Sequence, residues 1–312
     1  MNEKICLILG GYGFLGTYVA RKFKNEGYQI IGFGHNNYAR YTNIYDFNYY
    51  DDITKESLEA IGCIPKIIVN CAGSSSVSRT ASDCLAAFRK TVECNHIILE
   101  YISKIKKSST KYIYISSAAV YGDTGNMNIT ENDGLKPVSL YGEYKVLSED
   151  LCRYYFNNIG ISTCIIRPFS ISGIGLKKQL LWDACNKITE NIYDFFGNGK
   201  EKRYWIDVRD VADLIFKVAL DRTHSFEILN ACSGLQLTNK EFLSYLFERL
   251  NAKSKNLVFN GKIDINNPIN LVGSNSKAQK LYHWQPKYSW KEIIDNYTEW
   301  YLNLNRKQEE IL

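Results

Sequence analysis

The chain has 312 residues, of which 45% are apolar and 23% charged, so it is long and apolar enough to bury a large core. Its net charge is +5, and the lack of any long Lys or Arg block disfavours a nucleic-acid-binding surface. No apolar run approaches the ~18 residues that a membrane-spanning helix needs, so no membrane span is expected.

The nine cysteines and four histidines are scattered along the chain, without a C-x-x-C pair and without the spacing of metal ligands. Thiols within apolar runs behave as small hydrophobic side chains. The pattern predicts reduced thiols in a cytoplasmic protein, with no disulfide framework and no metal site. Residues 1–9 lead directly into a predicted strand, so no signal peptide is expected.

Apolar runs and helical patterns alternate through the first half of the chain. The expected strands cover residues 4–9, 28–33, 44–47, 66–70, 111–116 and 162–167. The expected helices between them cover residues 14–25, 55–61, 86–104 and 141–157. This alternation predicts an α/β fold with a doubly wound parallel sheet, the Rossmann arrangement, covered by helices on both faces.

After residue 168 the alternation becomes irregular. Residues 204–221 are expected to return a strand and a helix to the sheet, and later helices are expected at 239–250, 277–282 and 290–302. We therefore predict a first domain over residues 1–167 and a smaller C-terminal α/β lobe, mainly over 168–312. Since no low-complexity linker separates them, the two lobes are expected to form one rigid cleft.

A glycine-rich turn follows the first expected strand. Gly10, Gly13 and Gly16 form the pattern G-x-x-G-x-x-G, with Phe14 and Leu15 between the last two glycines. Glycines allow a tight turn and a close approach of the backbone to a pyrophosphate, and the N-terminus of the next helix favours an anion. The strand–turn–helix context predicts that this segment binds a dinucleotide.

The end of the second expected strand bears on which dinucleotide is bound. An NAD site usually places an Asp or Glu there for the adenosine ribose, but residues 32–37 read Gly-Phe-Gly-His-Asn-Asn. No carboxylate stands in this segment, whereas His35, Asn36 and Arg40 could meet a 2′-phosphate. The sequence therefore favours NADP(H), with NAD as the alternative.

Asp52 and Ile53 follow the third expected strand, where they are placed to meet the adenine. A second interpretation is that Asp52 caps the helix that begins near Lys55. The two roles are compatible, so both remain open at this point.

Tyr141 and Lys145 lie four residues apart and therefore share one face of the expected helix over residues 141–157. Together with the glycine-rich turn, they resemble the extended short-chain dehydrogenase/reductase family, in its nucleotide-sugar epimerase, dehydratase and reductase branch. The resemblance covers residues 5–297. Its motifs stand at residues 10–16, 52–53, 70–73, 95, 116–122, 141–145, 167–168, 203–212, 277–278 and 284–286.

The resemblance implies a role for each motif. Tyr141 is expected to be the general acid/base, and Lys145 to lower the pKa of its phenol and hold the nicotinamide ribose. Ser117 is expected to hydrogen-bond the reacting sugar oxygen. Further contacts to the cofactor are implied for Cys71, Ala72, Gly73 and Asn95.

The substrate end is expected in the C-terminal lobe. Arg203 matches the family arginine that reaches the nucleotide, and a guanidinium suits a diphosphate in both geometry and charge. Lys178 and Gln179 stand where relatives contact the sugar or diphosphate, although Lys178 could equally face solvent. Ser75 and Ser76 could line the sugar or only shape a loop.

Two alanines distinguish the reactions of this family. Related 4,6-dehydratases carry Asp-Glu where this chain has Ala118 and Ala119, which cannot transfer a proton, so dehydration is not expected. The sequence favours an NADPH-dependent reductase of a nucleoside-diphosphate 4-keto-6-deoxyhexose, such as dTDP-4-dehydro-6-deoxyglucose, with hydride delivered to C4 and a proton from Tyr141. The alternative is an NAD-dependent 4-epimerase of a UDP-hexose or UDP-N-acetylhexosamine.

A non-catalytic protein on the same fold is disfavoured, because the three catalytic positions are intact. The resemblance also implies a homodimer, in which the helices over residues 86–104 and 141–157 pack into a four-helix bundle. The expected partners are thus a nucleotide-sugar substrate and a second copy of the chain, with no nucleic acid and no membrane.

Overall fold

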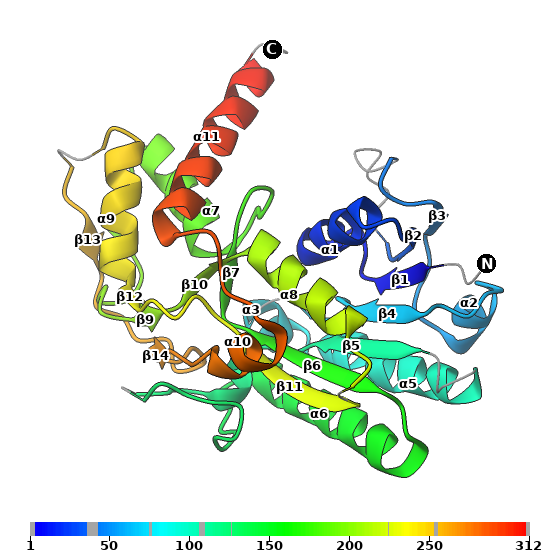
Figure 1. The fold of residues 1–312 in the computed structure, drawn as a ribbon. Helices are drawn as coiled ribbons and strands as arrows, with labels where there is room; N and C mark the ends of the chain where they lie inside the picture. Colours follow the sequence, from blue (N-terminus) through cyan, green and yellow to red (C-terminus); the bar gives the residue numbers. More distant parts are fainter. Residues whose placement is uncertain are drawn as a thin grey trace.

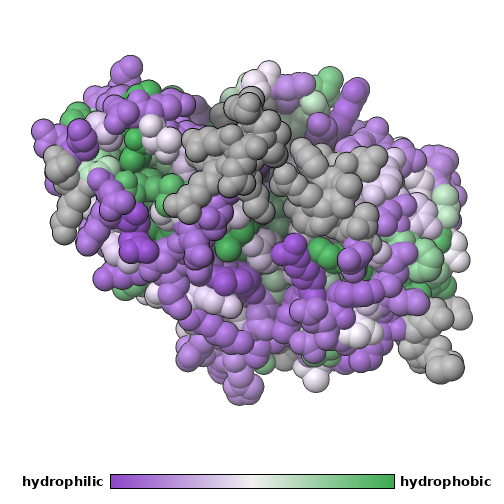
Figure 2. All heavy atoms as spheres, turned by 90° about the horizontal axis from the view of Figure 1, so that it is seen from above, coloured by the Kyte–Doolittle hydropathy of each residue, from purple (hydrophilic) through white to green (hydrophobic). Residues whose placement is uncertain are grey.

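The structure is a computed structural model that describes residues 4–35, 43–74, 77–105, 110–125, 127–223, 225–252 and 255–309. Figure 1 shows a larger lobe built on a twisted sheet and a smaller lobe beside the carboxyl ends of its strands. Every described helix is too short or too polar to span a bilayer. The face seen in Figure 2 is mostly hydrophilic, with a group of apolar side chains over the smaller lobe.

The larger lobe contains a seven-stranded sheet in the order β11-β6-β5-β4-β1-β2-β3, and every neighbouring pair is parallel. Its strands are β1 (Ile5–Leu9), β2 (Gln29–Phe33), β3 (Phe47–Tyr49), β4 (Ile67–Asn70), β5 (Lys111–Ile115), β6 (Thr163–Pro168) and β11 (Phe226–Ala231). The strand order reverses between β1 and β4, and open α/β sheets bind their ligands at such a crevice. The predicted doubly wound Rossmann sheet is confirmed.

Helices cover both faces of this sheet (Figure 1). One face carries α1 (Phe14–Asn25), α8 (Val208–Leu220) and α10 (Ser276–Tyr282). The other carries α2 (Lys55–Glu59), α3 (Val77–Ser82), α4 (Cys84–Phe88), the π-helical turn η2 (Arg89–Glu93), α5 (Cys94–Lys104) and α6 (Leu140–Ile159). The expected helix over residues 86–104 is therefore a longer helical run, interrupted by a π-helical turn.

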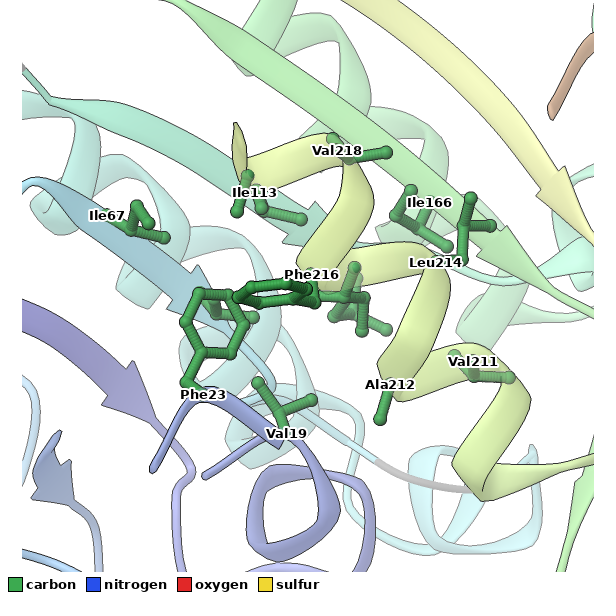
Figure 3. Packing of buried hydrophobic residues seen from close by; sticks show 14 of the residues in the cluster. Val19, Phe23, Ile67, Ile113, Ile166, Val211, Ala212, Leu214, Phe216 and Val218 are labelled. Carbon is green, nitrogen blue, oxygen red and sulfur yellow. The ribbon is translucent and has the colours of Figure 1, made fainter. Parts of the chain in front are cut away.

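The strands alternate their side chains between the two cores. Cys6 and Ile8 of β1 belong to the core beneath α1 and α8, whereas Leu7 and Leu9 belong to the core beneath α5 and α6. In Figure 3, Phe23 from α1 lies among side chains of α8 and of the central strands. The nine cysteines are free thiols, as the sequence predicted.

The third strand begins three residues later than expected. Residues 44–47 were expected to pair with β2, but the ladder begins only at Phe47. Before it, the Asp46 side chain accepts a hydrogen bond from the backbone N–H of Ile30 at 2.7 Å. A side chain thus takes the place that a backbone partner would fill, and the strand starts after it.

The smaller lobe consists of short elements around their own core. Its helices are α7 (Gln179–Thr189), α9 (Asn239–Arg249) and α11 (Trp290–Glu309), and a 3₁₀ turn, η4 (Ala118–Tyr121), lies where the lobes meet the sheet. Its strands are β7 (Ser170–Ser172), β8 (Asp194–Phe195), β9 (Lys202–Arg203), β10 (Trp205–Asp207), β12 (Leu237–Thr238), β13 (Val258–Phe259) and β14 (Asn270–Leu271).

The strand expected to return to the sheet within residues 204–221 does not do so. It is β10, which pairs with β7 outside the seven-stranded sheet. The strand ends after three residues because Asp207 caps the helix α8 that follows. Helix α8 does pack on the sheet, as expected. The returning strand is β11, an edge strand whose Glu227 and Asn230 weaken the apolar pattern that would have indicated it.

Candidate active site

The glycine-rich turn joins β1 to α1 at the crevice between β1 and β4. Gly10 has φ +69°, and a Cβ placed on it would lie 2.7 Å from the backbone nitrogen of Ala72. A Cβ on Gly16 would lie 2.3 Å from the carbonyl oxygen of Gly10. Both positions therefore require glycine, which leaves bare backbone facing the crevice as a pyrophosphate needs.

Helix α1 begins directly after this turn. Gly13 is its N-cap residue, and no side chain caps the first backbone N–H groups. Phe14 packs partly against the core of the smaller lobe, and Leu15 packs against the sheet. Uncapped N–H groups at a helix start suit an anionic diphosphate, so these residues fit a dinucleotide cofactor.

Two tyrosines that no sequence motif indicates fix this turn. The hydroxyl of Tyr12 donates to the carbonyl oxygen of Gly32 at 2.9 Å, and its ring stacks on Tyr50 with centroids 5.0 Å apart. The hydroxyl of Tyr45 donates to the carbonyl oxygen of Gly11 at 2.5 Å. These contacts join positions far apart in sequence, so no local spacing indicates them.

A carboxylate does lie close to the end of β2. The Nε2 atom of His35 lies 2.8 Å from Oδ1 of Asp52, and both side chains are largely exposed. The sequence segment lacks an acid, but the fold brings one to it from beyond β3. Asn36 and Arg40, the other expected contacts to a 2′-phosphate, lie outside the described residues.

The interpretation of Asp52 as a helix cap is wrong. The N-cap residue of α2 is Thr54, whose hydroxyl accepts a hydrogen bond from the backbone N–H of Ser57 at 3.1 Å. The Ser57 side chain in turn accepts from the backbone N–H of Thr54, so the two form a capping box. Asp52 is thereby left to face His35, and Ile53 packs against the core beneath α5.

Ser117, Tyr141 and Lys145 come together at the carboxyl end of β5. Ser117 begins the 3₁₀ turn η4, where its hydroxyl accepts from the backbone N–H of Ala119 at 3.1 Å. Tyr141 lies in the first turn of α6, and Lys145 follows one turn later on the same face. Burial raises the pKa of the Tyr141 phenol, and its hydrogen bond with Ser117 offsets part of that rise.

The ammonium of Lys145 is hydrogen-bonded to the end of β5. It donates to the carbonyl oxygen of Ile115 at 2.8 Å, and it lies 5.0 Å from the centroid of the Tyr114 ring and 6.0 Å from that of Tyr141. Burial lowers the pKa of Lys145 to about 8, and the carboxylate of Glu149 opposes this change. The group can therefore release its proton near physiological pH.

Residues 71–73 lie between the glycine-rich turn and Lys145. A Cβ on Gly10 would lie 2.8 Å from the carbonyl carbon of Cys71, and a Cβ on Gly73 would lie 3.7 Å from Nζ of Lys145. The backbone N–H of Ala72 donates to Oδ1 of Asn70 at 3.0 Å, which fixes the chain where it leaves β4. The structure thus brings these three expected cofactor contacts beside the catalytic residues.

Asn95 lies behind this site, not in it. Its side chain is fully buried, its Nδ2 donates to the carbonyl oxygen of Ser148 at 3.0 Å, and its Oδ1 accepts from the Tyr112 hydroxyl at 2.5 Å. The residue on this helix that faces the site is Thr91, whose Oγ1 would lie 3.5 Å from a Cβ on Gly73. Thr91 belongs to the π-helical turn η2, whereas Asn95, which the family resemblance implied as a cofactor contact, follows that turn in α5.

In the smaller lobe, where the substrate is expected, the Arg203 side chain donates hydrogen bonds to backbone carbonyl groups. Its Nη1 donates to the carbonyl oxygens of Lys202 and Ile269, each at 2.8 Å, and its Nη2 donates to that of Pro268 at 2.7 Å. Burial lowers the pKa of this guanidinium. The arginine expected to reach the nucleotide therefore also ties β9 to the segment that leads into β14.

The other expected substrate residues lie at one helix start or outside the described chain. Lys178 is the N-cap residue of α7, and Gln179 begins that helix with φ +66°, a conformation that few residues other than glycine adopt. Ser75 and Ser76 are not among the described residues. Ser74, just before them, donates from its backbone N–H to Oγ1 of Thr91 at 3.0 Å.

Comparisons with known proteins add to this geometry. Residues 6–232 match the model of a family described as the NAD dependent epimerase/dehydratase family. A Bacillus subtilis (strain 168) protein named "Uncharacterized UDP-glucose epimerase YtcB" is 27% identical over 187 residues, which cover 59% of this chain and 58% of that protein. UDP-glucose 4-epimerase 4 of Oryza sativa subsp. japonica is 24% identical over 340 residues, covering 96% of this chain and 90% of the relative.

Among solved structures, the chain resembles UDP-glucuronic acid 4-epimerase from Bacillus cereus in complex with UDP-glucuronic acid and NAD. The TM-score is 0.86 at 20% identity, and the match covers 96% of this chain and 99% of the other. At this level of identity the likeness shows a common fold.

Proposed function

We propose that this chain, which belongs to the NAD dependent epimerase/dehydratase family, interconverts the C4 epimers of a UDP-hexose or UDP-N-acetylhexosamine with NAD as its cofactor. Membership confirms the resemblance to the extended short-chain dehydrogenases/reductases, and the chain is an NAD(P)-dependent nucleotide-sugar enzyme. The observation that carries the proposal is that Ser117, Tyr141 and Lys145 lie together beside the glycine-rich turn. The 3₁₀ turn η4, which Ser117 begins, contains no Asp or Glu.

The absence of an acid in η4 argues against dehydration. Loss of water from a sugar requires a group that protonates the departing hydroxyl and another that removes a proton from carbon. The positions after Ser117 are Ala118 and Ala119, whose methyl groups can do neither. Epimerisation at C4 makes no such demand, because the same tyrosine can take up and return one proton.

The carboxylate beside β2 supports NAD over the NADP(H) that the sequence favours. Asp52 stands 2.8 Å from His35 at the end of that strand. A carboxylate at this edge can accept hydrogen bonds from the adenosine ribose hydroxyls and would repel a 2′-phosphate. The similar Bacillus cereus epimerase was solved in complex with NAD, which agrees with this choice.

NAD, held by the glycine-rich turn, would supply a hydride acceptor for C4 and, once the 4-keto sugar has turned over in the site, a hydride donor to its opposite face. Tyr141 accepts the proton of the C4 hydroxyl as that hydride leaves, and Ser117 donates a hydrogen bond to the same oxygen. Because burial raises the pKa of Tyr141, its phenolate requires a positive charge nearby. Lys145, with its ammonium 6.0 Å from the centroid of the Tyr141 ring, supplies that charge.

The test is to incubate the purified chain with UDP-glucose or UDP-N-acetylglucosamine and to separate the C4 epimers by chromatography. A parallel assay measures NADPH and NADH oxidation with dTDP-4-keto-6-deoxyglucose. We expect the UDP-sugar to interconvert with no net consumption of reduced cofactor. Rapid NADPH oxidation with no interconversion would overturn the proposal and establish the reductase instead.

We also propose that the chain forms a homodimer through α4, α5 and α6. A groove of about 410 Å³ between these helices is lined mainly by apolar side chains, among them Leu85, Phe88 and Leu151. Leu85 is 60% exposed and Leu147 is 45% exposed. A second copy placed against this face would cover them as a four-helix bundle.

Light scattering tests the homodimer and should give twice the chain mass. The Leu85→Asp variant should give the mass of a monomer. A monomeric parent chain would contradict the proposal.

A further inference from the structure

A buried ion pair lies next to the catalytic residues. Glu149 of α6 and Arg167 of β6 are each 2% exposed. The guanidinium donates from Nε to Oε1 of Glu149 at 3.0 Å and from Nη2 to Oε2 at 2.5 Å, so the pair is bidentate. Glu149 follows Tyr141 by two helical turns and Lys145 by one, which places all three on the same side of α6.

This pair holds the turn that carries Ser117 at both of its ends. Before it, the hydroxyl of Ser116 donates to Oε1 of Glu149 at 2.5 Å. After it, Tyr121 accepts at its hydroxyl oxygen from Nη1 of Arg167 at 2.7 Å. Both anchors of the Ser117 turn are therefore set by side chains of α6 and β6.

The outer end of the network is also anchored. The hydroxyl of Tyr121 donates to Oδ1 of Asn230 in β11 at 2.7 Å, and the backbone N–H of Asn230 donates to Oε1 of Glu131 at 2.7 Å. A buried charge network is tolerated when its members are satisfied. This one links the catalytic helix to the far edge of the sheet.

Glu149 also acts on Lys145 through its charge. Among the described residues, three titratable groups act on the charge of Lys145: Glu149 and Cys152 of α6, and Cys71 after β4. The rings of Tyr114 and Tyr141 lie beside its ammonium. The thiols are neutral because burial raises the pKa of each to about 12. The carboxylate of Glu149 is thus the charge in this set that favours the ammonium form of Lys145.

We propose that Glu149 is a positioning residue: through Arg167 it fixes the Ser117 turn against the helix of Tyr141 and Lys145, and its carboxylate, one turn of α6 from Lys145, favours the ammonium form of that side chain. The catalytic part rests on the proposed function, whereas the effect on Lys145 stands without it. Stability alone does not explain such a pair, since well-packed apolar residues often replace a buried ion pair without loss. In that apolar arrangement the Ser116 hydroxyl would lose its acceptor, and Tyr121 would lose the donor Arg167 and keep its bond to Asn230.

The first test is Glu149→Gln, which keeps the shape and removes the charge. The proton equilibrium of Lys145 is measured by trace acetylation with acetic anhydride across pH, followed by mass spectrometry of its peptide. We expect the midpoint of the Lys145 titration to fall by about one pH unit, since loss of a nearby opposite charge shifts the pKa of a lysine by that order.

The matched control is Asp210→Asn, which alters a buried carboxylate that accepts hydrogen bonds from the backbone N–H groups of Lys287 and Tyr288. It should leave the Lys145 midpoint unchanged.

The epimerisation assay tests the geometric half. In Glu149→Gln we expect kcat to fall about tenfold or more with little change in KM, because misplaced catalytic groups lower the rate and not substrate binding. The alkaline limb of kcat against pH should move with the Lys145 midpoint. An unchanged midpoint together with an unchanged kcat would overturn the proposal.

A second variant covers the case in which Glu149→Gln leaves Arg167 charged, buried and poorly paired, and the chain fails to fold. Glu149→Gln/Arg167→Gln removes both charges, and we expect it to fold, with a lowered Lys145 midpoint and a reduced kcat. A folded double variant with the parent midpoint and the parent kcat would refute the proposal. Acetylation needs no substrate, so a parent chain without epimerase activity would refute the proposed function while leaving the test of Lys145 intact.

Discussion

Lys145 in the catalytic corner is buried and Arg203 at the substrate end is half-buried, and these two cations use their hydrogen bonds differently. The ammonium of Lys145 makes a 2.8 Å bond to one carbonyl and lies beside the Tyr141 ring. The guanidinium of Arg203 donates to three backbone carbonyls of its own lobe. The first arrangement leaves charge directed at a reacting group, whereas the second holds two chain segments together. A motif therefore predicts a residue type more surely than it predicts that residue's partners.

The largest effect is expected from Tyr141→Phe, which removes the proton-transferring hydroxyl and keeps the ring. We expect epimerisation to fall by about 10³-fold, within the range for loss of a general acid/base. Binding of NAD, measured by quenching of tryptophan fluorescence, should change little because the glycine cradle is untouched.

The matched control is Tyr144→Phe, less than one turn further along α6. Tyr144 packs edge-on against Phe88 with centroids 5.5 Å apart, on the side of the helix that faces α4. Its hydroxyl has no place in the proposed reaction, so this variant should keep parental turnover. Equal losses in the two tyrosine variants would mean that the catalytic corner is not where the structure indicates.

Gly16→Ala should produce the next largest effect, at the cofactor end. The added Cβ would lie 2.3 Å from the carbonyl oxygen of Gly10 and 2.8 Å from Cα of Gly11, so the turn has to move. Overpacking of this kind costs about 1–3 kcal/mol, and NAD affinity should fall by about tenfold or more. Isothermal titration with NAD measures the affinity and urea unfolding measures the stability.

Gly134→Ala is the control for that substitution. Apart from its neighbours along the chain, no atom lies within 4 Å of the place that the added methyl group would take, and the φ of Gly134 is not in the left-handed region. Its stability and NAD affinity should match those of the parent chain. If Gly16→Ala bound NAD as tightly as Gly134→Ala does, the turn would not be the pyrophosphate cradle.

The pH dependence follows from Lys145, whose pKa burial lowers to about 8. Turnover should fall about tenfold per pH unit above this value, because the ammonium that supports the Tyr141 phenolate is lost. For folding the sign is opposite. An unfolded chain keeps this proton up to about pH 10.4, so between about pH 8 and that value the unfolded state binds more protons and the stability from Lys145 rises with pH.

Lys145→Met isolates that contribution, since it lacks the titrating group. The free energy of unfolding of the parent chain relative to this variant should rise by about 3 kcal/mol from pH 7 to pH 10, by urea unfolding at each pH. A difference that stays flat with pH would show that Lys145 titrates normally and is not desolvated.

Local pattern was enough to predict much of the fold and the shared helix face of Tyr141 and Lys145, whereas the expected role of Ser117 came from the family resemblance. The buried parallel strands are continuous apolar runs, and the Tyr141–Lys145 spacing follows from helical geometry, so both can be read within a few residues. Contacts made across the sheet could not be read in this way. Asp52 meets His35 because β3 lies beside β2, and Thr91 meets Ser74 because the fold brings η2 beside the segment that follows β4.

Arg203→Gln carries the smallest expected effect and sharpens the comparison with Lys145 most directly. Three carbonyl oxygens would lose their charged donor, which should cost about 1–3 kcal/mol of stability in urea unfolding. Arg203→Lys serves as the control, because it keeps the charge but cannot reach all three carbonyls with one planar group. If the arginine is mainly a tie, both variants lose stability and KM for the UDP-sugar rises only a fewfold. If Arg203→Gln were as stable as the parent chain while its KM rose a hundredfold, the guanidinium would serve the nucleotide as the family resemblance implies, and the two cations would no longer differ in kind.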